Sequence, residues 1–395
     1  MRRLIKNNVS WIGYVDWELE TFHGHDYNTK RGSSQNAYLV EEEKTVLIDT
    51  VWTPHRDEFI ENLAAEVGLD KIDMIVMNHG ERDHSGTLPA LMEKIPGTPI
   101  YCTANAVKSI EGQYGKRGWD FHVVKTGDRV DVGNGKELIY IEMRMLHWPD
   151  SMATYLTGDN ILFSMDAFGQ HLASAELFND QVDQGKLYEE AIKYYANILN
   201  PFSPMVKNKL PEIAAMNLPI DFICPSHGVI WRDNPMQIVE KYAQWCDNYK
   251  EDQVCVVYDT MWEGTAKIAH AIANEIKLQS PDTVVKVFHI PTTDQTEVMG
   301  EVFKSRAIAL GSPTAIGGYL STVGGWLEHA RELKFKGKKA AAFGCYGWSG
   351  ESVKLMQAKL AEIGFEVITE NVRANWNPGE ADLAKIPELV KSLLA

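Results

Sequence analysis

The sequence has few cysteines, and they are far apart. Its 395 residues contain five: Cys102, Cys224, Cys246, Cys255 and Cys345. An odd, scattered set without a C-x-x-C pair excludes a disulfide framework and a site built from four thiolates. We expect most of them to be small buried side chains, with Cys345 as the exception because it lies in a candidate ligand loop.

The sequence also lacks long apolar runs and an excess of positive charge. No run reaches membrane-spanning length, and the N-terminus has no apolar segment of signal-peptide type. The formal net charge of -15 argues against nucleic acid or an anionic membrane as a partner, because either would require a basic face. These absences predict a cytoplasmic protein whose partner is neither nucleic acid nor a membrane.

No Gly/Ser-rich linker, internal repeat or low-complexity tract divides the chain. A length of 395 residues nevertheless exceeds one ordinary core, so two domains are expected. The pattern changes where a predicted helix at 235–247 leads into the polar stretch 249–253. We therefore predict domains at 1–250 and 251–395, held close together because the junction is short.

The first domain alternates short apolar runs with turn formers and helices. Strands are predicted at 37–40 and 45–48, and helices at 56–67 and 187–199. This alternation favours an α/β fold in which helices cover two sheets, an αββα sandwich.

Metal-binding side chains are concentrated in residues 79–84, directly after the predicted strand 74–77. The segment contains His79, Glu81, Asp83 and His84. Imidazole and carboxylate groups at this density indicate a metal site at a strand end, in preference to an ordinary solvated loop.

Further candidate ligands lie at later strand ends. His147, Asp166 and His227 each follow an apolar run beside turn formers. Each alone has an ordinary structural explanation, as a hydrogen-bonded histidine or an aspartate that caps a turn. Together they complete a two-metal set, with Asp166 as the bridging carboxylate. The carboxylate at Glu81 is a harder ligand than imidazole, which favours iron over zinc.

The second domain alternates strands and helices. Strands are predicted at 254–258, 284–290, 307–310, 340–343 and 366–369. Helices fall between them, the first at 265–277. About five such units in roughly 140 residues predict a flavodoxin-like doubly wound parallel sheet, whose ligands bind at the carboxyl ends of the strands.

Three loops at those strand ends indicate a flavin site. Their candidate cofactor-binding residues are Thr260, Met261, Trp262, Glu263, Gly264, Thr265, Ser312, Pro313, Thr314, Ala315, Gly344, Cys345, Tyr346, Gly347, Trp348, Ser349 and Gly350. The first loop has two hydroxyls and a glycine before a helix, which can hold a phosphate without a basic side chain. It lacks the signatures of ATP and NAD sites. Because Tyr346 and Trp348 offer aromatic faces to a planar ring, the predicted cofactor is FMN.

The two halves together resemble the flavodiiron proteins, also called A-type flavoproteins, over essentially the whole chain. The matching segments are H-x-E-x-D-H at 79–84, Leu-His-Trp-Pro-Asp-Ser at 146–151, Asp-Ala-Phe-Gly-Gln at 166–170, Tyr-Tyr-Ala-Asn at 194–197, Ser-His-Gly at 226–228 and Gly-Trp-Ser-Gly at 347–350. The core is particularly similar to that of the flavorubredoxin branch. Because the chain ends at Ala395 without a rubredoxin module, it resembles the minimal two-domain class, which implies an external electron donor.

The resemblance implies a metallo-β-lactamase-like first domain with two irons and a flavodoxin-like second domain with FMN. The implied ligands are His79, Glu81 and His147 for one iron and Asp83, His84 and His227 for the other, with Asp166 between them. His25 and Tyr195 are candidates to donate a hydrogen bond to bound O2 or NO. Ordinary packing is an equal alternative for both.

The implied activity is reduction of O2 to water, of NO to N2O, or of both, with electrons that reach the irons through FMN from a small donor such as rubredoxin. The implied assembly is a head-to-tail homodimer or a dimer of such dimers. Two other classes stay open: a metallo-β-lactamase-type hydrolase fused to a flavin domain, and a non-catalytic electron carrier or redox sensor. The residues do not decide between O2 and NO.

Overall fold

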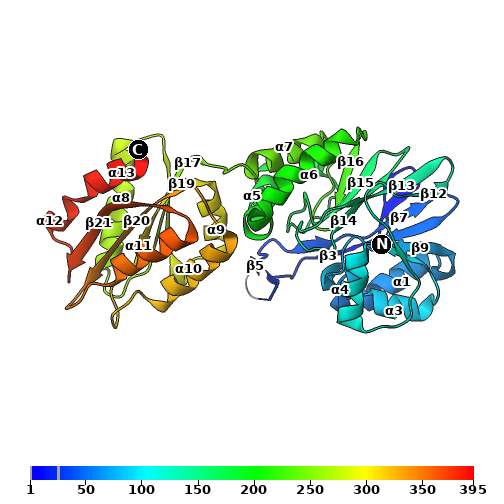
Figure 1. Cartoon of the computed structure of the whole chain (residues 1–395), viewed down its shortest axis with the longest axis horizontal. Coiled ribbons are helices and arrows are strands. Elements are labelled where there is room, and N and C mark those ends of the chain that lie inside the picture. The colour runs from blue at the N-terminus through cyan, green and yellow to red at the C-terminus, as the bar shows by residue number, and fades with distance from the viewer. Residues whose placement is uncertain (1, 25–26) are drawn as a thin grey trace. The chain divides into compact units, whose positions relative to one another are not determined.

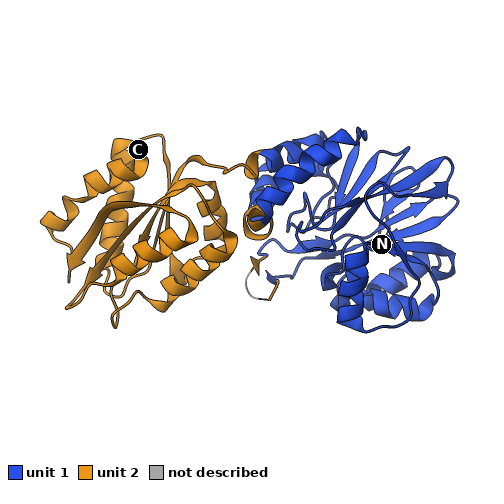
Figure 2. Ribbon diagram, viewed as in Figure 1, with its two compact units in different colours: residues 1–22, 29–194, 202–243 blue, residues 23–28, 195–201, 244–395 orange. Residues whose placement is uncertain are grey.

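The computed structural model describes residues 2–24 and 27–395, which separate into two compact units (Figure 2). The first unit comprises Met1–Phe22, Thr29–Tyr194 and Phe202–Ala243, and the second comprises His23–Asn28, Tyr195–Pro201 and Gln244–Ala395. The domain boundary between residues 250 and 251 stays a prediction. None of the helices in the described part of the chain has the length and apolar content that crossing a bilayer requires.

The first unit contains two β-sheets with helices outside them (Figure 1). The seven-stranded sheet has the order β1 (Arg3–Lys6), β2 (Val9–Trp11), β7 (Tyr38–Glu41), β8 (Thr45–Ile48), β9 (Ile72–Val76), β10 (Ile100–Cys102) and β11 (Phe121–Val123). The five-stranded sheet has the order β12 (Arg129–Gly133), β13 (Lys136–Glu142), β14 (Met152–Leu156), β15 (Ile161–Met165) and β16 (Phe222–Pro225). The short strands of this unit are β3 (Tyr14–Asp16), β4 (Thr21–Phe22) and β6 (Ser33–Gln35), of which β3 pairs with β6. The short strand β5 (Tyr27–Asn28) belongs to the second unit.

Alternation of side chains along the strands explains this layering. Val46, Val76 and Phe163 are buried in one apolar cluster between the sheets. Leu47 and Ile75 point the other way and pack against the outer helices, because successive side chains of a strand face opposite sides. The helices are α1 (Arg56–Glu66), α2 (Arg82–Ser85), α3 (Leu88–Lys94), α4 (Ala104–Tyr114), α5 (Gln184–Tyr194), α6 (Ser203–Ala215) and α7 (Met236–Trp245). The predicted αββα sandwich is confirmed.

The second unit is a five-stranded, fully parallel sheet with helices on both faces (Figure 1). Its order is β18 (Val284–His289), β17 (Glu251–Tyr258), β19 (Ser305–Gly311), β20 (Lys339–Tyr346) and β21 (Glu366–Asn375). Its helices are α8 (Gly264–Gln279), α9 (Gln295–Lys304), α10 (Ser321–Leu333), α11 (Ser352–Ile363), α12 (Glu380–Leu383) and α13 (Ile386–Leu394). The direction of winding reverses between β17 and β19, and a ligand crevice is expected at their carboxyl ends.

Three of the differences between predicted and observed elements affect residues predicted to belong to the site. The predicted helix 187–199 ends as an α-helix at Tyr194 and continues as the π-helical segment Tyr195–Leu199, because apolar periodicity does not distinguish the two forms. The strands predicted at 340–343 and 366–369 extend to Tyr346 and Asn375 as β20 and β21. The two extensions pair with each other, so Gly344, Cys345 and Tyr346 lie on a strand and not in a loop.

Candidate functional site

The predicted metal ligands lie at one edge of the sandwich. β9 ends at Val76 before the segment 79–84, β13 ends at Glu142 before His147, β15 ends directly before Asp166, and β16 ends at Pro225 before His227. β13, β15 and β16 run in the same direction within their sheet. Their carboxyl ends therefore meet at the same edge, which brings together ligands that are far apart in the sequence.

All seven predicted ligands come together in two groups that share Asp166. One group is His79, Glu81, His147 and Asp166, and the other is Asp83, His84, Asp166 and His227. Within each group, the potential ligand atoms all lie within 4.8 Å of one another. The structure thus contains two adjacent places where a metal ion can be held.

The two carboxylate oxygens of Asp166 face different groups. Oδ2 is 3.7 Å from Nε2 of His79 and 3.5 Å from Nε2 of His147. Oδ1 is 3.1 Å from Nε2 of His84 and 3.6 Å from Nε2 of His227. This is the arrangement of a carboxylate that bridges two metal ions.

A second carboxylate belongs to each group. Oε2 of Glu81 is 3.3 Å from Nε2 of both His79 and His147. Oδ2 of Asp83 is 3.0 Å from Nε2 of His84 and 3.1 Å from Nε2 of His227. Each group therefore pairs two imidazoles with one carboxylate of its own and with the shared Asp166.

Two carboxylate oxygens of this cluster are buried without a hydrogen-bond partner: Oδ1 of Asp83 and Oδ2 of Asp166. Buried polar atoms without a partner are rare in native proteins and call for a specific explanation, such as a bound ion. The mixed imidazole and carboxylate donors suit iron. The residues present therefore fit two iron ions.

The carboxylates make the cluster strongly favourable for positive charge. Burial alone would lower the pKa of His79, but hydrogen bonds to Asp150 and Glu81 raise it to about 10. Burial would raise the pKa of Asp166, yet the neighbouring histidines, His84 first, lower it to about 2. Protons or metal ions can supply the positive charge that this field stabilises.

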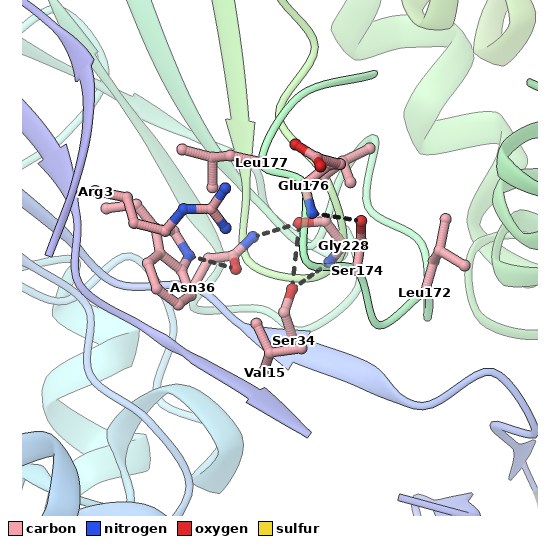
Figure 3. A pocket seen from close by; sticks show the side chains of 11 residues that line it. Arg3, Val15, Ser34, Asn36, Leu172, Ser174, Glu176, Leu177 and Gly228 are labelled. Atoms are coloured by element: carbon pink, nitrogen blue, oxygen red, sulfur yellow. Dashed lines mark hydrogen bonds between the residues drawn. The ribbon is translucent and has the colours of Figure 1, made fainter. Parts of the chain in front are cut away.

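Main-chain and side-chain groups behind His227 fix its orientation. Its Nδ1 donates to the carbonyl oxygen of Ser34 at 2.8 Å, which leaves Nε2 for the metal. The carbonyl of Gly228 accepts from Ser34 Oγ at 3.2 Å and from Asn36 Nδ2 at 2.9 Å (Figure 3). A cavity of about 10 Å³, roughly the room for one water, lies beside these groups. A side chain at Gly228 would collide with Gln170, since its Cβ would lie 1.4 Å from Oε1 of that residue.

The structure adds aromatic residues that the sequence did not single out. The ring of His171 is 5.0 Å from that of His227, and the ring of Tyr194 is 5.1 Å from that of His171. Nδ1 of His171 is 2.7 Å from Oγ of Ser33. The available signals were their positions, since His171 directly follows the motif 166–170 and Tyr194 begins the motif 194–197.

Tyr195 and His25 are the two residues predicted to contact bound gas. The ring of Tyr195 lies 5.5 Å from that of Trp245 and 5.6 Å from that of Phe303, and its role stays a prediction. The ring of the neighbouring Tyr194 lies 6.3 Å from that of His227. His25 lies outside the described residues, so its role stays a prediction.

The three predicted flavin loops lie next to one another at the carboxyl ends of β17, β19 and β20. The main-chain N–H of Thr314 donates to the carbonyl of Cys345 at 2.8 Å, which joins the second segment to the third. Gly264 lies against Cys345, since a Cβ there would be 2.9 Å from the sulfur. The hydroxyl oxygens of Thr260 and Thr265 are buried without a hydrogen-bond partner, so they fit the phosphate of FMN.

Two segments beside these loops were not predicted. Residues 316–318 form a tight turn in which Ile316 has φ 47° and is fully exposed. After β21, the main-chain N–H of Trp376 donates to the carbonyl of Tyr346 at 2.7 Å. The ring of Trp376 covers Gly347, where a Cβ would lie 2.8 Å from it. The adjacent glycines 317 and 318 were the available signal for the turn.

Comparisons with known proteins agree with this architecture. Residues 33–228 match the model of the ODP family beta lactamases, and residues 256–388 match the flavodoxin model. The rubredoxin oxygen:oxidoreductase of Desulfovibrio gigas has a similar structure, with a TM-score of 0.96, 33% identity and coverage of 100% of this chain and 98% of that one. The flavodiiron protein of Giardia intestinalis gives a TM-score of 0.95, 31% identity and coverage of 100% and 96%.

Sequence relatives point to the same family. The chain is 50% identical over 374 residues to an anaerobic nitric oxide reductase flavorubredoxin of Vibrio vulnificus, which covers 95% of this chain and 76% of that protein. The flavorubredoxin of an Escherichia coli strain is 50% identical over 380 residues, with 96% and 79% coverage. The first domain is metallo-β-lactamase-like and the second flavodoxin-like, and the chain belongs to the flavodiiron proteins.

Proposed function

We propose that this chain is an oxidoreductase that reduces NO to N2O, O2 to water, or both, with electrons from an external redox protein. The observation that carries the proposal is the pair of ligand groups that share Asp166, in a chain that also has a flavodoxin-like domain. Relatives named as anaerobic nitric oxide reductases support NO as a substrate. The relative named as a rubredoxin oxygen:oxidoreductase supports O2.

The chain carries FMN and a diiron centre. We assign one iron to His79, Glu81 and His147, the other to Asp83, His84 and His227, and the bridge to Asp166. When bound, the two irons and FMN together supply four electrons, the number that reduction of O2 to water requires. We assign the flavin phosphate to the first loop, where Thr260 and Thr265 have buried hydroxyls.

Exposure of the ligands supports a very small substrate. The side chains of Glu81 and His147 are 17% and 12% exposed, whereas those of the other ligands are 6% exposed or less. Glu81 and His147 therefore mark the side from which we expect a substrate to approach. The small exposed fraction of these side chains favours a diatomic gas over the larger substrate of a metallo-β-lactamase-type hydrolase.

The proposal is tested by loading the purified chain with iron without air, reducing it, and mixing it in parallel with O2 and NO. We expect about two irons per chain and rapid reoxidation by at least one gas, and the ratio of the two rates gives the preference. A chain that retains only zinc would favour the hydrolase. A reduced diiron chain that consumes neither gas would leave the electron carrier or redox sensor.

We also propose that the electron donor is rubredoxin or another small redox protein, and that the chain works in the cytoplasm. The name of the Desulfovibrio gigas relative supports the donor. All five cysteines are free, as is usual in a reducing compartment, which supports the location. The rate at which each candidate donor reduces the FMN, recorded by flavin absorbance at equal donor concentrations, ranks the donors.

The working unit is proposed to be a head-to-tail homodimer, alone or paired into a dimer of dimers, in which the FMN of one chain serves the diiron centre of its partner. Apolar side chains around the flavin loops support a covering partner, because Trp262 is 86% exposed, Trp348 87% and Ile316 fully exposed in the single chain. Exposed apolar patches of this kind mark interfaces.

Mixing two inactive variants tests the shared site. A His79→Ala chain is combined with a chain that carries Trp348→Ala and Thr265→Ala, after dissociation and reassembly. Mixed dimers contain one intact FMN facing one intact diiron centre, so partial gas reduction should return, whereas each variant alone should stay inactive. Mixed dimers without activity would indicate that electrons travel within one chain.

A further inference from the structure

Asp150 lies behind the ligand His79 and is completely buried. Its Oδ2 accepts the main-chain N–H of Gly80 at 2.8 Å and is 3.3 Å from Nδ1 of His79. An ionised carboxylate only accepts hydrogen bonds, so Nδ1 of His79 must carry the hydrogen. When this imidazole is neutral, as a metal ligand must be, its lone pair is on Nε2, the atom that faces Glu81 and Asp166.

We propose that Asp150 is a positioning residue of the diiron centre, which fixes the orientation and tautomer of His79 and joins two ligand loops. The inference deepens the proposed function and rests on it. Asp150 lies three residues after His147, whereas Gly80 lies between His79 and Glu81. The carboxylate therefore ties together the two loops that supply one ligand group. Carboxylates behind metal-bound histidines act in this way in other metal sites.

The fold around Asp150 is built to hold its carboxylate in place. Its main-chain carbonyl accepts from Oγ1 of Thr103 at 3.0 Å, and Thr103 is the residue that caps the N-terminus of α4. Gly80 permits the close approach, because a Cβ there would lie 2.8 Å from Oδ2 of Asp150. The hydrogen bonds from Thr103 to the main chain of Asp150 and from Gly80 to its carboxylate thus set the distance between the carboxylate and the imidazole of His79.

The two ligand groups differ in what lies behind their histidines. His227 is oriented by a main-chain carbonyl, that of Ser34, which a side-chain substitution does not remove. His79 is oriented by a side chain. Asp49, another buried carboxylate nearby, binds both amide groups of Asn78, at 2.7 Å and 2.9 Å. Asp150 is therefore a position at which one ligand group can be perturbed while its own ligands stay unchanged.

Two substitutions separate geometry from charge. Asp150→Asn keeps an oxygen that can accept from Nδ1 of His79 and from Gly80 but removes the negative charge. Asp150→Ala removes the acceptor and leaves His79 without its orienting partner. The matched control is Asp159→Asn, because Asp159 is also buried in the first unit but pairs with Lys136 at 2.6 Å and not with a metal ligand. Loss of that buried pair destabilises the fold without touching the proposed site.

Each variant is loaded with iron-57 without air, and iron retention against a chelator, the Mössbauer spectrum, FMN content and thermal unfolding are measured. Asp150→Ala should weaken iron binding by about 10- to 100-fold. Asp150→Asn should weaken it less. In both, the spectral change should be confined to one of the two iron signals, whereas Asp159→Asn should lower only the unfolding temperature.

The outcomes distinguish a failure of the proposed function from a failure of the proposed role of Asp150. If the unaltered chain holds no iron, the proposed function fails. If it holds two irons and a folded Asp150→Ala chain retains both with unchanged release and spectrum, the role of Asp150 is refuted. If Asp150→Ala does not fold, the Asp150→Asn chain decides. Iron binding and a Mössbauer spectrum in that variant equal to those of the unaltered chain would refute the role of Asp150. A uniform loss of both iron signals that follows the unfolding temperature, as in the control, would reduce Asp150 to ordinary packing.

Discussion

Thr265→Val should have opposite effects on FMN binding and on the stability of the flavin-free chain. Valine has nearly the shape of threonine but lacks the hydroxyl. The hydroxyl of Thr265 is buried in the first flavin loop without an oxygen or nitrogen partner. It adjoins the Cys345 thiol, which is only a weak hydrogen-bonding group. Burial raises the pKa of that thiol, and the Thr265 hydroxyl lowers it by a smaller amount.

The magnitudes follow from this lack of a partner. A hydrogen bond to a charged group contributes about 1.5–3 kcal/mol, so the loss of one to the phosphate should weaken FMN binding about 10- to 150-fold. Removing a buried hydroxyl that has no partner relieves a penalty of about 1–3 kcal/mol in the flavin-free chain. That chain should therefore unfold at a temperature equal to or higher than that of the unaltered chain, by roughly 2–4 °C for each kcal/mol.

Fluorescence titration of the flavin-free chain with FMN gives the affinity, and thermal unfolding gives the stability. Thr283→Val is the matched control, because Thr283 is buried in the same unit but its hydroxyl bonds to Asp252 at 3.0 Å and to Ser280 at 2.8 Å. The control should lose stability and keep its FMN affinity. Unchanged FMN affinity in Thr265→Val, or a loss of stability equal to that of the control, would refute the reasoning.

Three further results are expected. Asp166→Ala should lose the paired iron signal and keep FMN, because both ligand groups share that carboxylate. Metal and flavin analysis of one preparation tests this, and retention of both irons would contradict it. Gly347→Ala should weaken FMN binding, since its Cβ would lie 2.8 Å from the ring of Trp376 and displace it; an unchanged titration would contradict this. Burial, together with the charge of Lys250, lowers the pKa of Lys338 from 10.5 to about 7. Between these two pH values the unfolded chain binds more protons than the folded chain, so the free energy of unfolding should rise with pH. Lys338→Met should abolish that rise in urea unfolding measured at pH 7 and pH 9.5.

The metal ligands were predictable because their chemistry is concentrated in the sequence. Four of the seven occur within residues 79–84, and the other three each follow a strand. The sequence predicted that Asp166 and His227 each follow a strand, and the parallel pairing of β15 with β16, which the structure adds, brings them to the same edge. The flavin loops were predicted from the alternation of strands and helices, because ligands of such sheets bind at the carboxyl ends of the strands.

The supporting residues could not be predicted in this way. Asp150 stands within a recognisable motif, but only the folded chain places its carboxylate against Gly80, 70 residues earlier. The change from α-helix to π-helix between Tyr194 and Tyr195 has no signal in the apolar pattern, and neither does the position of the Tyr194 ring, 6.3 Å from that of His227. Trp376 follows β21, whose polar residues led to a predicted end at residue 369, whereas the strand extends to Asn375.

The charge balance of the metal site also determines how it takes up iron. In the metal-free chain, burial acts against the charged forms of His79 and His84, yet their carboxylate neighbours raise both pKa values, that of His79 to about 10. These imidazoles are therefore protonated near neutral pH, and iron can bind only as the protons leave. Iron affinity should increase with pH below about 10, by up to tenfold per pH unit for each proton released. Competition with a chelator whose own pH dependence is known, measured between pH 6.5 and 8.5, tests this. A pH-independent affinity would mean that the histidines are already neutral before the metal arrives.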